Sequence, residues 1–176
     1  MATNPIPELI NDMRAYIDGS TDMISVKSME LPELSRPTVD VTGVGVAGTI
    51  AAPVHGHFES METTLTWQVP TATSTKLTGG VPISLDAYAD RQGFDGGENA
   101  YQHKQYHVVI CGRVKSHAPG TLEAQNAMES TTTIETHYLK ISLDNEELCE
   151  IDKYGYICKI GGADMLSIVR QNIGMG

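Results

Sequence analysis

Four stretches of the chain alternate apolar and polar side chains with a period of two, and this pattern limits the possible fold more than any other feature. In the first stretch, Leu65, Trp67 and Val69 alternate with Glu62, Thr64, Thr66 and Gln68. In the second, Val81, Ile83, Leu85, Ala87 and Ala89 alternate with Ser84, Asp86, Tyr88 and Asp90. Successive side chains of a β-strand point to opposite faces of its sheet. The two stretches therefore predict strands at 62–69 and 81–90, each with an apolar and a polar face.

The other two stretches are longer. Thr131–Leu143 carries Leu139, Ile141 and Leu143 on one parity, and Tyr101–His117 carries Val108, Ile110 and Val114. Strands are usually about five or six residues long, so both segments are unusual. Long strands with a polar second face suit the wall of a large barrel or an extended sheet.

Turn signals separate the predicted strands. Asp18-Gly19 follows a short predicted strand at 13–17, and later turns are predicted at Asp95-Gly96-Gly97, Asp144-Asn145 and Tyr154-Gly155. Helix signals are sparse: one short helix is predicted within 162–172 and one or two helical turns within 71–78. Residues 118–130 fit either a loop or a short helix. With 176 residues, the chain predicts a single, mainly β domain over 1–176 with one or two short helices.

Composition argues against several classes of function. The formal net charge is −10, and no stretch concentrates Lys and Arg. This argues against tight nucleic-acid binding and against binding to anionic membranes. No segment approaches the roughly 18 apolar residues of a membrane span. Met1–Arg14 has no apolar run and is not typical of a signal peptide, so we expect synthesis in a cytoplasm.

A glycine-rich string, Gly43-Val44-Gly45-Val46-Ala47-Gly48, matches the dinucleotide-binding fingerprint. That motif needs a helix directly after it, and Pro53 would break such a helix in its second turn. We therefore predict a flexible loop and no cofactor.

The pair His55 and His57 would place two imidazoles on one side of a strand. A zinc site needs at least one more protein ligand, and the spacing of the other histidines supplies none. We therefore predict no metal site and expect both histidines to face solvent.

Five carboxylates and three cysteines complete the candidate chemistry. Catalytic carboxylate pairs usually come from separate elements around a pocket, so a cluster on one hairpin is better interpreted as a solvated face. The cluster contains Asp144, Glu146, Glu147, Glu150 and Asp152. Cys111, Cys149 and Cys158 fit no zinc spacing and indicate small buried thiols, although a disulfide between subunits stays open. Since no catalytic motif is present, we expect that the protein is not an enzyme.

Two blocks of sequence carry a resemblance. The first is Glu30-Leu31-Pro32-Glu33-Leu34-Ser35-Arg36, followed by the glycines 43, 45 and 48. The second comprises Tyr138–Asp144 and Glu147–Asp152, followed by Gly162–Asp164 and Arg170–Gly174. In these blocks the chain resembles the major tail tube proteins of contractile-tailed phages and of phage-tail-like bacteriocins. The extension Met1–Glu8 and a predicted loop at Gln92–Ala100 depart from that family.

The resemblance implies a tail-tube-like fold, in which two packed β-sheets form a sandwich or small barrel with a flanking helix. It implies six-fold rings that stack into a hollow tube inside a contractile sheath. It also implies baseplate and tail terminator partners, a place in the virion tail and, in a phage, passage of DNA without specific binding. Phage tails and tail-like bacteriocins need the same ring, so the sequence does not separate them.

The resemblance also implies candidate contact residues. In relatives, a long loop or hairpin that matches about 37–58 reaches the next ring. Its candidate residues here are Gly43, Gly45, Gly48, Pro53, His55 and His57. Six copies at −10 each carry −60 per ring, so an acidic lumen would repel DNA from the wall. Either polar face is a candidate lumen wall: Glu62, Thr64, Thr66 and Gln68, or Ser84, Asp86, Tyr88 and Asp90.

Other interpretations stay open. Both polar faces fit an outer surface that contacts sheath or solvent. A β-sandwich binding module, glycan-binding or adhesin-like, would use Tyr88, Tyr101 and Tyr106 as aromatic contacts. A metal-dependent enzyme would rest on His55 and His57.

Overall fold

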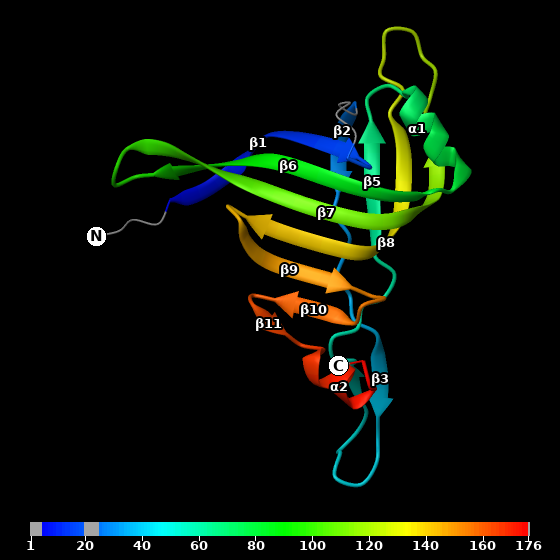
Figure 1. Cartoon of the computed structure of the whole chain (residues 1–176), viewed down its shortest axis with the longest axis vertical. Helices are drawn as coiled ribbons and strands as arrows, with labels where there is room; N and C mark the ends of the chain where they lie inside the picture. The colour runs from blue at the N-terminus through cyan, green and yellow to red at the C-terminus, as the bar shows by residue number, and fades with distance from the viewer. Residues whose placement is uncertain (1–4, 20–24, 176) are drawn as a thin grey trace.

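The computed structural model describes residues 5–19 and 25–175, which fold mainly into β-strands in two sheets with short helices (Figure 1). The strands are β1 (Ile6–Ile17), β2 (Val26–Glu30), β3 (Thr38–Val41), β4 (Ile50–Pro53), β5 (Glu62–Trp67), β6 (Pro82–Asp95), β7 (Ala100–Ala118), β8 (Ser130–Leu143), β9 (Glu146–Asp152), β10 (Ile157–Ile160) and β11 (Ala163–Asp164). The helices are α1 (Ala72–Lys76), continued by the 3₁₀ turn η1 (Leu77–Gly79), and α2 (Ser167–Asn172). The predicted mainly β fold with short helices is confirmed.

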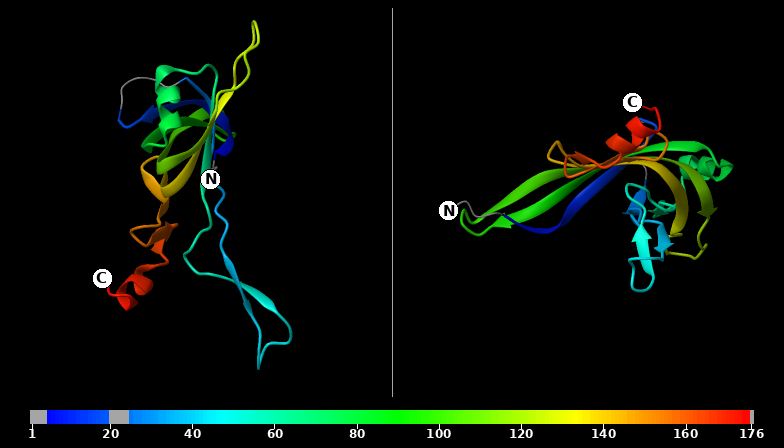
Figure 2. Two further views of the ribbon diagram at one scale, coloured as in Figure 1. Left: turned by 90° about the vertical axis from the view of Figure 1, so that its right-hand side faces the viewer. Right: turned by 90° about the horizontal axis from the view of Figure 1, so that it is seen from below.

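Within the described residues, nine strands form one antiparallel sheet around β8. One edge of β8 pairs with β7. The other edge is shared, because β5 pairs with Ser130–Glu135 and β9 pairs with Tyr138–Leu143. β2 continues the sheet beyond β5, and β1 and β6 continue it beyond β7. The sheet therefore has two wings that diverge along β8, and Figure 2 shows its strong curvature.

The second sheet is the two-stranded β3–β4 hairpin. It projects away from the large sheet at the lower end of the molecule, as both figures show (Figures 1 and 2). The β7–β8 loop and α1 lie at the opposite end of the long axis (Figure 1).

The core lies on the concave side of the large sheet. The alternating residues Leu65, Leu85, Ile110 and Ile134 are fully buried there, together with Trp67. Val69 departs from the predicted apolar face, since it is 52% exposed. β5 ends at Trp67 because the chain turns through Pro70 into α1, where the N-cap Thr71 forms a capping box with Ser74.

Buried threonines join β5 to β8 inside this core. The hydroxyls of Thr63 and Thr136 lie 2.8 Å apart, and the Trp67 indole Nε1 donates to Thr132 Oγ1 at 2.9 Å. Buried polar groups of this kind stabilise a fold only while each keeps its partner.

Replacing Thr132 with valine is expected to lower the free energy of unfolding by about 1–3 kcal/mol, because the buried Trp67 N–H loses its acceptor. Thr133→Val, on the opposite face of β8, is the matched control. It makes the same substitution but leaves the hydrogen bond from Trp67 to Thr132 in place. Urea unfolding followed by Trp67 fluorescence measures both variants. Equal stability of the two would contradict this role of Thr132.

The N-terminal strand is longer than predicted. β1 starts at Ile6 rather than at residue 13, so it includes part of the predicted extension Met1–Glu8, whose residues 1–4 lie outside the described ranges. Pro7 obscured the pattern. An edge strand tolerates proline, which has no N–H, because an N–H that points away from the sheet would have no partner there. Asp18 and Gly19 do form a turn with positive φ, yet β1 pairs with β6 and β2 pairs with β5, so no hairpin joins β1 to β2.

Three later segments refine the prediction. The helix expected within 162–172 is reduced to α2, because Ala163–Asp164 pair with β10 as β11. The loop expected at Gln92–Ala100 is mostly strand, since β6 continues to Asp95. Residues 119–129 contain turns and bends and no helix. In the parts of the chain that the structure describes, no helix is long and apolar enough to cross a membrane.

Candidate assembly surfaces

The β3–β4 hairpin stands clear of the core and presents apolar side chains to solvent. β3 pairs with β4 along its whole length, and Pro53 ends β4. The tip holds Gly43, Gly45 and Gly48, whose φ angles of 137°, 96° and 121° favour glycine. The exposed apolar residues are Val39, Val41, Val44 and Ile50. A two-stranded hairpin is marginal alone in water, so this surface suits contact with another molecule.

At the base of the hairpin, the prediction that His55 and His57 share one side of a strand is wrong. His55 lies in a turn with Gly56, and His57 follows outside any strand, so their side chains do not share a strand face. The cause is Gly56, which has φ of 72° and packs so closely on Leu166 that a Cβ atom would collide. The ring of His57 instead meets Tyr156 edge-on, with centroids 6.3 Å apart.

The polar face of β5 is largely neutral. We call Glu62, Thr64, Thr66 and Gln68 the β5 stripe. Glu62 forms an ion pair with Lys115 of β7, and Thr64 and Thr66 are half-buried beside β8. Gln68 lies beyond the end of β5, so it does not continue the strand face as predicted. This stripe therefore offers hydroxyls and a neutralised carboxylate.

The polar face of β6 combines acidic and aromatic groups. We call Ser84, Asp86, Tyr88 and Asp90 the β6 stripe. Asp86 lies 3.2 Å from His107 Nε2, and the Tyr88 ring stacks on His107 with centroids 4.2 Å apart. Asp90 lies 2.8 Å from His103 Nδ1. An open hollow of about 790 Å³ covers part of this stripe and also includes Asp12, Arg14 and Tyr16.

The carboxylate of Asp90 is held ionised. Asn11 Nδ2 donates to Asp90 Oδ2 at 3.2 Å, and this bond and the contact with His103 lower the pKa of Asp90. Asp12 lies directly opposite Asp90 in the β1–β6 pairing. The β6 stripe therefore keeps negative charge near neutral pH.

The two stripes lie on the same convex face of one sheet but point in different directions. Thr64 pairs with Thr133 on one wing of β8, whereas Asp86 pairs with Val109 and Val109 with Lys140 on the other wing. The sheet curves between these wings (Figure 2).

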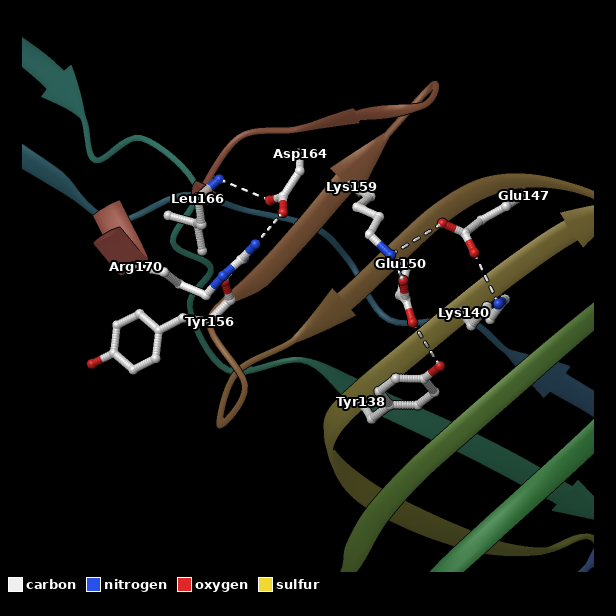
Figure 3. Close-up of polar contacts among 9 residues, drawn as sticks. All are labelled: Tyr138, Lys140, Glu147, Glu150, Tyr156, Lys159, Asp164, Leu166 and Arg170. Carbon is white, nitrogen blue, oxygen red and sulfur yellow. Dashed lines mark hydrogen bonds and ion pairs between the residues drawn. The ribbon is translucent and has the colours of Figure 1, made fainter. Parts of the chain in front are cut away.

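Next to the β6 stripe, β8, β9 and β10 carry a network of ion pairs (Figure 3). Lys159 Nζ donates to Glu150 Oε2 at 2.6 Å, and Lys140 lies 2.8 Å from Glu147 Oε2. The Tyr138 hydroxyl donates to Glu150 Oε1 at 3.1 Å. Burial and the Glu150 charge raise the pKa of Tyr138 to about 12, so this phenol stays protonated at neutral pH.

The ion pairs change the interpretation of the predicted acidic cluster as a purely solvated face. Glu147 and Glu150 are paired with lysines rather than simply solvated, and Asp152 accepts from the backbone N–H groups of Tyr154 and Gly155 at 2.9 Å. Lys140 and Lys159 were missed because they come from two different strands. Asp144 and Glu146 stay exposed to solvent, as predicted, so only part of the cluster is paired with lysines.

Glu150 gives the network a pH dependence. The bond from Lys159 is the main cause that lowers the pKa of Glu150. A depressed carboxyl pKa contributes stability that is present above the unfolded value, about 4.3 for Glu, and is lost as pH falls through the folded value. Glu150→Gln should therefore flatten the loss of thermal stability between about pH 5 and pH 3 relative to wild type. Melting temperatures measured across this pH range test the prediction, with Glu123→Gln as a control at an exposed position. Parallel curves of melting temperature against pH for Glu150→Gln and wild type would contradict it.

A second charge pair fixes the C-terminal helix. Arg170 of α2 donates to Asp164 Oδ2 at 2.6 Å and to the Tyr156 carbonyl at 2.7 Å (Figure 3). Asp164 also accepts from the Leu166 N–H, and the bond from Arg170 is the main cause that lowers the pKa of Asp164. These contacts attach α2 to β11 and to the turn before β10, while Ile168 and Ile173 stay exposed.

The residues named for the two alternative functions lie apart in the described parts of the chain. Tyr88 stacks on His107, Tyr101 meets Phe94 edge-on at 5.3 Å, and Tyr106 packs against the core on the other face of the sheet, so the three rings form no common platform. Within residues 5–19 and 25–175, no group of three or more His, Cys, Asp or Glu side chains is placed to hold a metal ion.

A comparison with protein families decides the identity of the fold. The family model described as phage tail tube protein FII matches residues 7–174 of this chain. The chain belongs to the phage tail tube protein family. The tail tube protein of Escherichia phage P2 is 29% identical over 181 residues, which covers 97% of this chain and 99% of the relative. The major tail tube protein of Serratia phage KSP20 is 23% identical over 171 residues, or 91% of each chain.

Family membership confirms the resemblance found in the sequence. This tail tube protein is a structural component of a phage tail, where its copies assemble into the tube. Sequence reasoning missed several exposed apolar residues. They lie on β1, at Ile6, Leu9 and Ile10, and on α2 and the C-terminal segment, at Ile168, Ile173 and Met175. On β1 the sequence does hold a signal: Leu9 and Ile10 are adjacent, so both faces of this strand carry an apolar side chain.

Proposed function

We propose that this tail tube protein forms six-fold rings that stack into a hollow tube inside a contractile sheath. In a phage particle the tube is the conduit through which DNA leaves the head. The protein has no catalytic role and needs no cofactor for this task. Its copies are made in the host cytoplasm before they enter the tail.

The free edges of the large sheet carry this proposal. Among the described residues, β1 pairs only with β6, and β2 pairs only with β5, so each strand has one edge without a partner. Exposed edges promote pairing with another chain. Since the two edges differ, joining one to the other is a heterologous contact, which closes into a ring when repeated by rotation. Ring closure would satisfy the backbone groups of both strands.

The hairpin supports stacking of rings. It extends from one end of the long axis, and its apolar residues Val39, Val41 and Val44 are exposed (Figure 1). The base is fixed by packing of Gly56 on Leu166, whereas the glycines of the tip leave it adaptable. We assign Gly43, Gly45 and Gly48 to the contact with the next ring, with Pro53, His55 and His57 at the base that positions it.

The β6 stripe is the better candidate for the lumen wall. It keeps the carboxylates of Asp86 and Asp90 beside Asp12, whereas the charge of Glu62 in the β5 stripe is neutralised by Lys115. A wall with surplus negative charge repels DNA and lets it slide without specific binding. The β5 stripe then faces outward, toward the sheath. Baseplate and terminator proteins would contact the first and last rings.

Electron microscopy of the purified protein, with and without baseplates from the same phage, tests the proposal. The expected result is tubes that grow from baseplates, with six copies per ring. Protein that stays dispersed in the presence of these baseplates would overturn it.

A further inference from the structure

The β6–β7 hairpin extends beyond the body of the large sheet, with the start of β1 beside it. β8 pairs with β7 only from Tyr106 onward, so residues 100–104 have an unpaired edge among the described residues. We call residues 6–10 and 91–104 the arm. Figure 2 shows the arm projecting away from the rest of the molecule.

The end of the arm carries an apolar patch on one face. Ile6 lies directly opposite Phe94, and Phe94 lies directly opposite Tyr101, so the three side chains point to the same side. The two rings meet edge-on, with centroids 5.3 Å apart. Ile6 is 68% exposed and Tyr101 is 64% exposed. We call these three residues the arm patch, and it lies on the face of the β6 stripe because Phe94 is four residues from Asp90 on β6.

A second apolar patch lies on α2 and the segment after it. Ile168, Ile173 and Met175 are exposed by 68%, 52% and 48%, and we call them the α2 patch. The Met175 N–H donates to the Arg170 carbonyl at 2.9 Å, which holds the C-terminal segment against the helix. The charge of Arg170 is balanced by Asp164. Because each copy carries a formal net charge of −10, two apolar patches can meet without the repulsion that acidic surfaces would have.

The two patches lie on the same side of the large sheet. A row of directly paired residues crosses the sheet from β6 to β11: Asp86, Val109, Lys140, Glu150, Lys159 and Asp164. Paired residues share a face, so Asp164 points to the side of the β6 stripe, and Arg170 of α2 bonds to Asp164 there. Figure 2 shows α2 on the side of the sheet away from the β3–β4 hairpin. The α2 patch of one copy is therefore placed to overlie the arm patch of another.

We propose that the arm patch of one copy packs against the α2 patch of the neighbouring copy in the ring. This rests on the ring proposed above, in which the β1 edge of one copy meets the β2 edge of the next. β1 has 12 residues and β2 has 5, so the arm extends past β2 when these edges pair. The chain that leaves β2 leads to α2, since Arg36 Nη2 donates to Met165 Sδ at 3.9 Å just before that helix. A heterologous contact of this kind brings the arm of each copy to α2 of the next.

A second copy fits the arm patch better than other partners. Copies of this tail tube protein assemble with one another. Within one molecule the arm and α2 lie apart, so the chain does not cover either patch with the other (Figures 1 and 2). The arm patch holds no cation, so it offers no charge to the phosphates of DNA.

Truncation of each patch tests the contact. Tyr101→Ser on the arm and Ile168→Ser on α2 each remove one exposed side chain, so both monomers should melt close to wild type. Each variant should raise the critical concentration for baseplate-seeded tube growth at least about tenfold, because large apolar anchors carry most of the binding energy of an interface. Tyr154→Ser is the matched control, since Tyr154 is also 64% exposed and belongs to neither patch. It should assemble like wild type.

The combined Tyr101→Ser, Ile168→Ser variant shows whether the two patches meet. If they contact each other, the second change removes little that the first has not already removed. The combined rise in critical concentration should then stay within about threefold of the larger single effect. A rise close to the product of the two single effects would show that the patches have different partners and would overturn the proposal. Normal growth of Tyr101→Ser tubes would overturn it as well.

Crosslinking of assembled tubes is a second measurement, which does not depend on weakened growth. A variant with Tyr101→Cys and Ile168→Cys, treated with a short thiol crosslinker, should give covalent species of up to six copies. Wild type, whose own cysteines are buried or half-buried, gives the background. Tubes of the double variant that yield only single chains would overturn the arm contact and leave the ring proposal standing. Wild type that stays dispersed with baseplates would overturn the ring proposal and the arm contact with it.

Discussion

Replacing residues 42–49 with a two-residue Asn-Gly turn is expected to abolish tube growth without unfolding the protein. Val41 and Ile50 are paired in register, so a two-residue turn closes the shortened hairpin without changing its strands. The change removes Val44 and the three tip glycines, which lie far from the core cluster. If the tip bridges successive rings, single rings remain possible but stacking does not.

Sedimentation and electron microscopy of the shortened protein, each with baseplate seeds, measure this loss. The melting temperature of the monomer should match that of wild type, which shows that the fold is intact. Val44→Ser is a milder companion, since it removes one exposed apolar side chain and keeps the length of the tip. Tubes of normal length from the shortened protein would show that ring stacking does not use this hairpin.

Gly112→Ala is expected to be among the most destabilising single substitutions, lowering the free energy of unfolding by about 3 kcal/mol. Gly112 lies at a register shift between β7 and β8, where the backbones approach closely. A Cβ atom there would lie 2.5 Å from the Glu135 carbonyl oxygen and 2.5 Å from Ile134 Cγ2. Neither neighbour can retreat easily, because one is backbone and the other is fully buried.

Gly96→Ala is the matched control for this change. Gly96 is exposed in the β6–β7 turn, and no atom lies within 4 Å of the position of its Cβ. Gly96→Ala should change the free energy of unfolding by no more than about 0.5 kcal/mol. Chemical unfolding of the two variants gives the comparison, and a Gly112→Ala protein as stable as the control would refute the close approach at this bulge.

The parts of the fold that could be predicted are those whose signal is local. The alternation around Leu65, Leu85 and Ile110 located β5, β6 and β7, because one face of each strand packs on the core. Asp144 and Asn145 have φ of 53° and 66°, which a two-residue hairpin turn requires, so that turn was also predictable. Leu139 likewise marked the buried face of β8.

The parts that could not be predicted depend on pairing between distant segments. Nothing near Val26 shows that β2 pairs with β5 rather than with β1. The alternation that marks β5 and β6 gives no sign of the curvature that turns their polar faces apart. The ion pairs of Glu150 and Glu147 depend on Lys159 and Lys140, which lie on neighbouring strands.

The candidate assembly surfaces show the same division. The glycines of the hairpin tip were proposed from the family resemblance and the β6 stripe from its alternation, and their roles stay predictions. The pairing of Arg91 with Lys104 was not predictable, because the two become neighbours only when β6 pairs with β7. The placement of His55 and His57 on a strand was wrong because Gly56 adopts a turn conformation that residue order does not reveal.

The most direct test of the central claim is a cryo-electron microscopy reconstruction of tubes grown from this protein. The proposed function predicts rings of six copies, β3–β4 hairpins that reach the next ring, and Asp86 and Asp90 on the lumen wall. A tube whose lumen is lined by the β5 stripe, with Asp86 and Asp90 outside, would contradict the assignment of the wall. Particles without rotational symmetry or ring stacking would contradict the claim that this chain builds the tube by itself.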